Sequence, residues 1–315
     1  MDILTIGDAL VSFNPLTTGP LRFVSTFERK VGGAELNVAI GCSRLGLNTG
    51  WISRLGKDEF GRYVYNFVRG EGVDVSQVKL VEGYPTSIYF KELLSGEKVN
   101  SYYYRHQSPT LSFKENEMDE DYVKQAKILH ITGVFPAVND SNKGVLLHLL
   151  KVAKKHNLKV TLDPNIRLKL WSASEARETM LSYLPFVDVL LVGEEEAEIL
   201  FGTFEPEEFF TAIQKYGLQH AVLKQGERGA IAFKDGEVVQ VPVKNNIDVI
   251  DVIGAGDGFA AGYLYSIIQK WPLEKALTFA NAVAAHVIGV KGDNEGLPYK
   301  EDIEIFLGEK EGISR

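Results

Sequence analysis

The sequence contains a single cysteine and no run of apolar residues long enough to cross a membrane. Because Cys42 has no partner, an intramolecular disulfide is impossible and zinc sites built from cysteines are excluded. A membrane helix needs about 18 or more consecutive apolar residues, so we expect no membrane partner. The opening stretch, MDILTIGDAL, is too short and too acidic for a signal peptide, so we expect a cytoplasmic location.

Basic charge is also scarce, because 34 Lys and Arg face 42 Asp and Glu, a formal net charge of −8. This balance argues against a nucleic-acid partner, which requires a basic face. The six histidines lack the H-x-x-H and H-E-x-x-H spacings of histidine metal sites. With 45% hydrophobic and 24% charged residues over 315 positions, the composition is that of a folded chain with a large core.

Short apolar runs alternate with helical stretches from about residue 113 onward. The helical stretch 141–157 has one apolar face, and Ser141 is its expected cap. Strand–helix alternation predicts βαβ units and a mostly parallel sheet. The expected strands are 127–133, 159–165, 187–193 and 220–226, the expected helices are 141–157, 174–184, 205–217, 256–271 and 273–289, and a hairpin with an Asp-Gly turn is expected at 230–243.

Two earlier segments interrupt this pattern. Residues 86–93 and 98–105 are typical of strands, and the Gly-containing stretch 94–97 predicts a hairpin turn between them. We therefore expect a three-layer α/β/α sandwich with a mostly parallel central sheet and a small β-sheet lid. The core is assigned to residues 1–10, 34–84 and 113–315, and the lid to 11–33 and 85–112. In such folds the ligand lies at the carboxyl ends of the strands.

The sharpest motif is DVIGAGDG at 251–258. Gly254-Ala255-Gly256 opens a long apolar helix, where free backbone N–H groups and the helix dipole favour an anion such as phosphate. Asp257 lies beside that anion, where its carboxylate can accept the proton of an attacking hydroxyl. Alternatively, Asp257 only caps the helix and the glycines only form the turn. The Walker A and G-x-G-x-x-G fingerprints are absent, so neither argues for a nucleotide.

A second motif is the Gly32-Gly33 pair followed by Asn37. Paired glycines allow the backbone to approach a ligand closely, and an Asn amide supplies both a donor and an acceptor. Taken alone, the same stretch is equally consistent with a tight turn and a helix cap.

Together, Gly-Gly-x-x-x-Asn at 32–37 and Asp-x-x-Gly-Ala-Gly-Asp at 251–257 resemble the two signatures of the ribokinase/PfkB family of carbohydrate kinases. The resemblance extends over essentially the whole chain and implies a ribokinase-like fold. It also implies that a sugar hydroxyl attacks the γ-phosphate of ATP in the presence of Mg²⁺. Asp257 would be the base, and the backbone amides of Gly254, Ala255, Gly256 and Asp257 would form the anion hole.

The resemblance also implies residues around ATP. The stretch 224–230 resembles the nucleotide-phosphate loop, although alone it is simply a strand and a turn, and Asn281 resembles the Asn beside the adenosine. The implied ATP contacts are Asn165, Lys224, Gly226, Gly229, Gly254, Gly256 and Asn281. Where the family often has Asn-x-x-Glu, this sequence has Gly193 and Glu196, and Glu196 is assigned an indirect role at Mg²⁺. A monovalent cation beside Asp251 is possible, although Ile253 replaces a hydroxyl residue often found there.

The choice of sugar depends on two arginines. Tyr103 and Arg105 are two apart, so in a strand they share one face, and Arg105 suits a carboxylate. Alternatively, Arg105 lies along an aromatic surface with its charge in solvent. Arg167, in Asp-Pro-Asn-Ile-Arg, can hold the carboxylate and the transferring phosphate, so it joins the catalytic set. Together with the contacts that the family resemblance implies, the expected substrate contacts are Asp8, Gly33, Ala34, Asn37, Tyr89, Tyr103, Arg105, Arg167, Asp251, Asp257 and Asp293.

This set resembles the 2-keto-3-deoxygluconate kinase branch of the family, which makes 2-keto-3-deoxy-6-phosphogluconate. Two alternatives remain: a fructokinase or other neutral-sugar kinase in which Arg105 is structural, and a non-catalytic sugar-binding regulator, against which Asp257 argues. The exposed edges and the aromatic residues of the expected lid predict a homo-oligomer formed through it.

Overall fold

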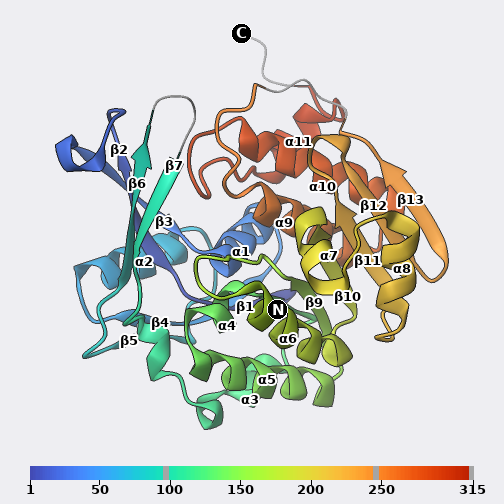
Figure 1. The fold of residues 1–315 in the computed structure, drawn as a ribbon, viewed down its shortest axis with the longest axis horizontal. Helices are drawn as coiled ribbons and strands as arrows, with labels where there is room; N and C mark the ends of the chain where they lie inside the picture. The colour runs from blue at the N-terminus through green and yellow to red at the C-terminus, as the bar shows by residue number, and fades with distance from the viewer. Residues whose placement is uncertain (95–98, 244–247, 312–315) are drawn as a thin grey trace.

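The computed structural model describes residues 1–94, 99–243 and 248–311 (Figure 1). Its largest element is a nine-stranded sheet in the order β13-β12-β11-β10-β9-β8-β1-β4-β5. Neighbouring strands from β5 to β11 are parallel, and β12 and β13 are antiparallel. The strands are β1 (Ile3–Ile6), β4 (Thr49–Gly56), β5 (Val78–Val81), β8 (Ile128–Thr132), β9 (Lys159–Asp163), β10 (Val189–Gly193), β11 (His220–Lys224), β12 (Ala230–Lys234) and β13 (Glu237–Val241).

Helices cover both faces of this sheet and complete three layers, as the sequence predicts. Alternation along each strand divides the core, so that Leu129 packs toward one helical layer and Ile128 toward the other. One layer contains α5 (Asp140–Lys155), α6 (Ala173–Tyr183), α7 (Glu194–Phe201) and α8 (Pro206–Gln214), beside the short α3 (Glu120–Val123) and α4 (Val134–Val138). The other contains α1 (Ala34–Arg44), α2 (Glu59–Gly70), α9 (Ala255–Ile268), α10 (Leu273–Ile288) and α11 (Lys300–Phe306).

A separate four-stranded sheet stands beside the α1 and α2 side of the molecule, at the left of Figure 1. It is formed by β2 (Leu10–Pro15), β3 (Phe27–Gly32), β6 (Ser87–Leu93) and β7 (Val99–Tyr104), in the order β3-β2-β6-β7. Its register places Tyr89 between Ser12 and Tyr103, and Phe90 between Phe13 and Tyr102. One face of the small sheet therefore carries polar groups and Tyr89, and the opposite face is aromatic.

Most of the predicted elements are confirmed, including the four central strands β8 to β11 and the hairpin of β12 and β13. The turn of that hairpin has positive φ at Asp235 and Gly236, which suits the Asp-Gly pair. The prediction that Ser141 caps α5 is wrong. Asn139 is the cap, because its side chain accepts the Asn142 N–H, and the Ser141 hydroxyl donates to Asn139. Residues 95–97 of the predicted turn lie outside the described residues.

None of the described helices combines the length and the apolar character that a membrane crossing requires.

Candidate functional site

The turn before α9 presents backbone N–H groups. Gly254 has φ +81°, and a Cβ there would lie 2.3 Å from the carbonyl oxygen of Asp293, so both conformation and space require glycine. The first internal hydrogen bond of α9 runs from the Gly258 N–H to the Gly254 oxygen, at 2.8 Å. The N–H groups of Gly256 and Asp257 therefore have no acceptor within the helix, and with the helix dipole they suit an anion.

The carboxylate of Asp257 lies directly at this turn and is held by two amides. Its Oδ2 accepts a hydrogen bond of 2.8 Å from Asn37 in α1, and its Oδ1 accepts one of 3.3 Å from Asn165, which follows β9. Asn165 has a positive φ of 38°, a strained conformation of the kind that collects at functional sites. Three segments distant in the sequence thus converge on one carboxylate.

Burial raises the pKa of Asp257 to about 7. The Asn37 hydrogen bond and the positive charge of the exposed Arg167 lower its pKa, whereas the carboxylates of Asp163 and Glu35 raise it. The side chain remains 7% exposed, and the preceding residues Gly254 to Gly256 are half-buried. A carboxyl group with a pKa near neutrality and some access to solvent is suited to accept a proton.

A partly buried ion pair lies beside the turn. Lys224, at the end of β11, donates to Asp163, at the end of β9, over 2.7 Å. Burial lowers the pKa of Lys224, but Asp163 and Glu196 more than offset this, so its pKa is raised and it stays charged. A Cβ on Gly256 would lie 3.9 Å from the Lys224 Nζ. This ammonium, paired with Asp163, therefore lies next to the free N–H groups.

Both carboxylate oxygens of Glu196 accept hydrogen bonds from backbone N–H groups. Its Oε1 accepts the Ile166 N–H at 2.9 Å and its Oε2 accepts the Gly193 N–H at 2.8 Å, so it fastens the start of α7 to the segment after β9. Burial raises its pKa. Among the described residues, no cluster of three or more His, Cys, Asp or Glu side chains is arranged to hold a metal ion.

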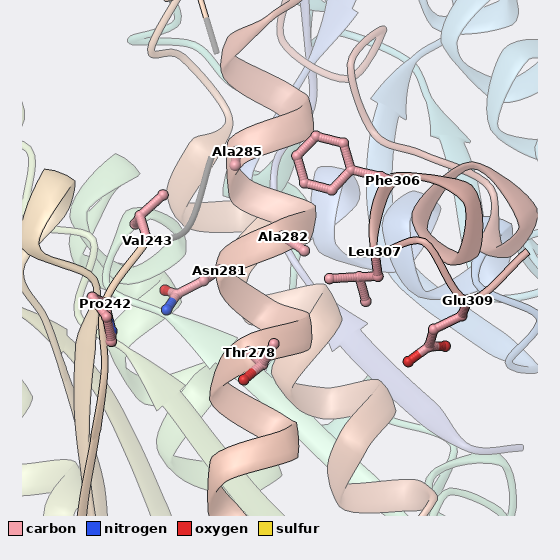
Figure 2. A pocket seen from close by; sticks show the side chains of 9 residues that line it. All are labelled: Pro242, Val243, Thr278, Asn281, Ala282, Ala285, Phe306, Leu307 and Glu309. Carbon is pink, nitrogen blue, oxygen red and sulfur yellow. The ribbon is translucent and has the colours of Figure 1, made fainter. Parts of the chain in front are cut away.

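A pocket of about 240 Å³ opens between α10, α11 and the end of β13 (Figure 2). It is lined by Pro242, Val243, Thr278, Asn281, Ala282, Ala285, Phe306, Leu307 and Glu309. The Asn281 amide donates to the Val241 oxygen at 3.1 Å, which fixes its orientation at the rim. A mostly apolar pocket with a few polar groups has the character of a small-molecule site.

The loop after β11 lies close to this pocket through β13. Gly226 and Gly229 both have positive φ, and a Cβ on Gly229 would lie 2.1 Å from the Val241 oxygen. The loop is closed by a hydrogen bond of 2.8 Å from the Gln225 N–H to the Gly229 oxygen. The glycines allow this compact turn, which directly follows Lys224.

Asp8, which follows β1, accepts hydrogen bonds through both of its carboxylate oxygens. Arg105 donates to its Oδ2 at 2.8 Å, Ser87 donates to the same oxygen at 3.2 Å, and Ser108 donates to its Oδ1 at 3.1 Å. Gly33 is the N-cap of α1 and lies close to this strand end, because a Cβ there would lie 2.7 Å from the backbone oxygen of Asp8. Ala34 then begins α1.

Several polar atoms in this region have no hydrogen-bond partner within the described part of the chain, among them the Oδ1 of Asn37, the Oε2 of Glu35 and the Nε of Arg105. Buried polar atoms are nearly always paired, so an unpaired acceptor and an unpaired charged donor need a further partner, either water or a ligand. Tyr103, which shares a face with Arg105 as predicted, stacks on Tyr89 with ring centres 5.3 Å apart.

Asp293, which follows α10 in the chain, contacts the small sheet through β6. Its carboxylate accepts 2.8 Å hydrogen bonds from the Tyr89 hydroxyl and the Lys91 ammonium. Asp251 accepts the Ile253 N–H at 3.1 Å and the Gly292 N–H at 3.3 Å, so it shapes the turn before α9.

The structure thus joins most of the predicted site residues through direct contacts, and it adds two that the sequence analysis omitted. Asp163 holds Lys224, and its position at a strand end could have identified it. Lys91 holds Asp293, and its two-residue spacing from Tyr89 is the same signal that identifies Arg105 with Tyr103.

Comparison with curated proteins finds whole-length relatives. The 2-dehydro-3-deoxygluconokinase of Thermoproteus tenax is 34% identical, with 98% of this chain and 94% of the relative covered. A 5-dehydro-2-deoxygluconokinase of Clostridium tetani (strain Massachusetts / E88) is 31% identical, with 98% and 94% covered.

Solved structures share the fold. The 2-dehydro-3-deoxygluconokinase of Thermotoga maritima superposes with a TM-score of 0.88 at 25% identity, covering 98% of both chains. A putative ribokinase II from E. coli, in complex with ATP and Mg²⁺, gives 0.91 at 22% identity, covering 98% of this chain and 99% of that one. The family model described as "pfkB family carbohydrate kinase" matches residues 1–300. The chain therefore belongs to the pfkB family of carbohydrate kinases, enzymes that transfer a phosphoryl group to a sugar.

Proposed function

We propose that this kinase phosphorylates the C6 hydroxyl of 2-keto-3-deoxygluconate with ATP, giving 2-keto-3-deoxy-6-phosphogluconate. The observation that carries the proposal is the Asp257 carboxylate, which lies beside the free N–H groups of α9 and is oriented by Asn37 and Asn165. Relatives of the same length carry the name 2-dehydro-3-deoxygluconokinase, a synonym for the kinase of this sugar acid.

In the proposed reaction Asp257 accepts the proton of the sugar hydroxyl. The hydroxyl oxygen then attacks the γ-phosphorus of ATP, the bond from that phosphorus to the β–γ bridging oxygen breaks, and ADP leaves with the electron pair. The N–H groups of Gly254, Gly256 and Asp257 would face the developing negative charge, and Lys224 adds its ammonium nearby. The Ala255 N–H, predicted to join them, instead donates to the Val252 oxygen at 3.3 Å. Arg167, exposed but close enough to lower the pKa of Asp257, is suited to hold the transferring phosphate.

ATP fits the opposite end of the site. The apolar pocket beside Asn281 suits the adenine, and the glycine loop at 226–229 suits the phosphates. Mg²⁺ neutralises phosphate charge when it is bound. Because Mg²⁺ prefers phosphate oxygens and water over an all-protein cage, the absence of an acidic cluster within the described chain fits this role. Glu196 would act indirectly, by fixing the backbone around the phosphates.

The acidic sugar is supported by a guanidinium N–H on the acceptor side that is unpaired among the described residues. Arg105 has a buried Nε without a partner in the described chain, and Asn37 has a buried acceptor that can receive a sugar hydroxyl. A second acceptor, 5-dehydro-2-deoxygluconate, is favoured by the relatives that carry the name of its kinase. Both compounds carry the carboxylate that fructose and ribose lack.

The small sheet, with its connections (residues 11–33 and 85–112), would be a lid over the sugar, and residues 1–10, 34–84 and 113–315 the core. Asp251 would also be the place to look for a monovalent cation, since it shapes the loop before α9.

Replacing Asp257 with Asn keeps its size and removes its basicity. We expect kcat to fall by about a hundredfold or more, while binding of ATP and of the sugar acid persists. Coupled ADP release and calorimetry measure the two effects, and Asp235→Asn, at an exposed hairpin tip, is the matched control. An Asp257→Asn enzyme that turns over at the unmodified rate would assign the base to another residue.

The raised pKa of Asp257 predicts a pH profile. Because the base must be deprotonated, kcat/KM should fall tenfold per pH unit below about pH 7 and level off above it. Asn37→Ala removes a hydrogen bond that lowers this pKa, so its rising limb should move to higher pH. A limb that stays in place in Asn37→Ala would contradict the assignment.

Acceptor preference tests the sugar class. Among 2-keto-3-deoxygluconate, 5-dehydro-2-deoxygluconate, fructose and ribose, we expect the first to give the highest kcat/KM. Arg105→Met should lower kcat/KM for the acids by about 10- to 100-fold, the value of a charged hydrogen bond, with a smaller loss for fructose. Arg105→Lys controls for the buried Asp8 left behind. Fructose used as well as the acids would favour a neutral-sugar kinase.

The aromatic face of the small sheet supports self-association. Phe13 and Phe90 stack at 4.9 Å, and Tyr104 beside them is 57% exposed. We propose that two copies pair through this face, since such patches mark contact surfaces. Light scattering should give a dimer mass that Tyr104→Glu reduces, and a monomer mass for the unmodified protein at working concentration would refute the pairing.

A further inference from the structure

Asp293 lies between the small sheet and the turn that begins α9. Its side chain faces the small sheet, where Lys91 and Tyr89 of β6 donate to it. Its backbone oxygen faces the core, where it lies so close to Gly254 that a Cβ at that position would come within 2.3 Å. One residue therefore touches both the proposed lid and the proposed anion hole.

Other residues of the segment 291–294 also contact both the small sheet and the loop before α9. Its Gly292 N–H donates to Asp251, in the loop before α9, at 3.3 Å. The Asn294 amide donates to the Val31 oxygen of β3 at 2.7 Å, and Lys30 of β3 donates to the Lys291 oxygen at 3.1 Å. The segment is thus bonded to the small sheet on one side and to the anion-hole loop on the other.

A buried ion pair joins Lys91 to Asp293. Their side chains are only 5% and 8% exposed, and Nζ and Oδ1 are 2.8 Å apart. A buried carboxylate that loses its cation is strongly destabilised and will rotate toward water or take up a proton. Gly32 also packs against this carboxylate, since a Cβ there would lie 2.3 Å from its Oδ2. Little space exists for Asp293 to move without moving its backbone.

We propose that Lys91 is a positioning residue, which fixes Asp293 and thereby couples the placement of the small sheet over the sugar to the geometry of the Gly254 turn. The proposal rests on the proposed kinase function for its kinetic consequences. It gives Lys91 a role different from that of Arg105, whose buried Nε is unpaired among the described residues and is proposed to bind the substrate carboxylate. The Lys91 ammonium is directed to Asp293 instead.

The test compares Lys91→Met, which keeps the length and loses the charge, with Lys91→Arg, which keeps the charge. We expect Lys91→Met to lower kcat by about tenfold or more, because small displacements at a phosphoryl site are costly. The slow hydrolysis of ATP without any sugar should fall by a similar factor. Lys91→Arg should recover most of both rates, and Lys291→Met, in the same segment with an exposed side chain, should leave both unchanged.

Hydrogen exchange supplies a readout that needs no turnover. In Lys91→Met, the amides of 251–258 should exchange faster than in the unmodified protein, although Lys91 lies in the other sheet. A rise in the KM for sugar alone, with ATP hydrolysis and exchange unchanged, would make Lys91 a substrate ligand and overturn the proposal. A lower melting temperature with unchanged kcat would make it merely structural. If the unmodified protein phosphorylates no sugar, the proposed function fails, and exchange at 251–258 still decides the coupling.

Discussion

The arrangement of the site depends on one carboxylate, that of Asp257, which is almost fully buried and has a pKa of about 7. Removing a charged carboxylate from water costs several kcal/mol, so it needs compensation from every direction. The α9 dipole, the Asn37 and Asn165 amides and the charge of Arg167 supply it in part. The compensation stops short of full stabilisation, which is why the pKa stays near 7. A fully satisfied carboxylate would be a structural cap with little basicity.

This constraint explains why the site uses strand ends that are far apart in the chain. A parallel sheet brings the ends of β1, β9, β10 and β11 to one edge, and α9 begins at the same edge. Asp163 and Lys224 can then neutralise each other next to the anion site without either being fully exposed. The order of strands, and not any local sequence motif, places a lysine beside the free N–H groups of α9.

The sequence predicts the elements and motifs of this site better than the contacts between its side chains. Apolar alternation located β8 to β11, and the Gly-Ala-Gly-Asp motif located the start of α9, because both are local patterns. The pairing of Asp8 with Arg105 joins residues 97 apart, and no local pattern reports it. The sequence could have identified Lys91, because alternation places it on the same face of β6 as Tyr89. A lysine in a strand is, however, ordinarily exposed to solvent. Only the position of Asp293 shows otherwise.

The small sheet is joined to the core both by apolar packing, through Val11 and Val31, and by buried ion pairs. Arg105 pairs with Asp8 and Lys91 with Asp293, and both pairs are buried. Ion pairs are directional, so they fix a sheet in one orientation where an apolar face would allow it to slide. They are also sensitive to a newly arrived carboxylate, which competes for the same cations. An acidic sugar entering between Arg105 and Asp8 would therefore change the forces on the small sheet in a way that a neutral sugar would not. Under the proposed function, the charge on Arg105 that would bind an acidic sugar is the same charge that pairs the small sheet with Asp8.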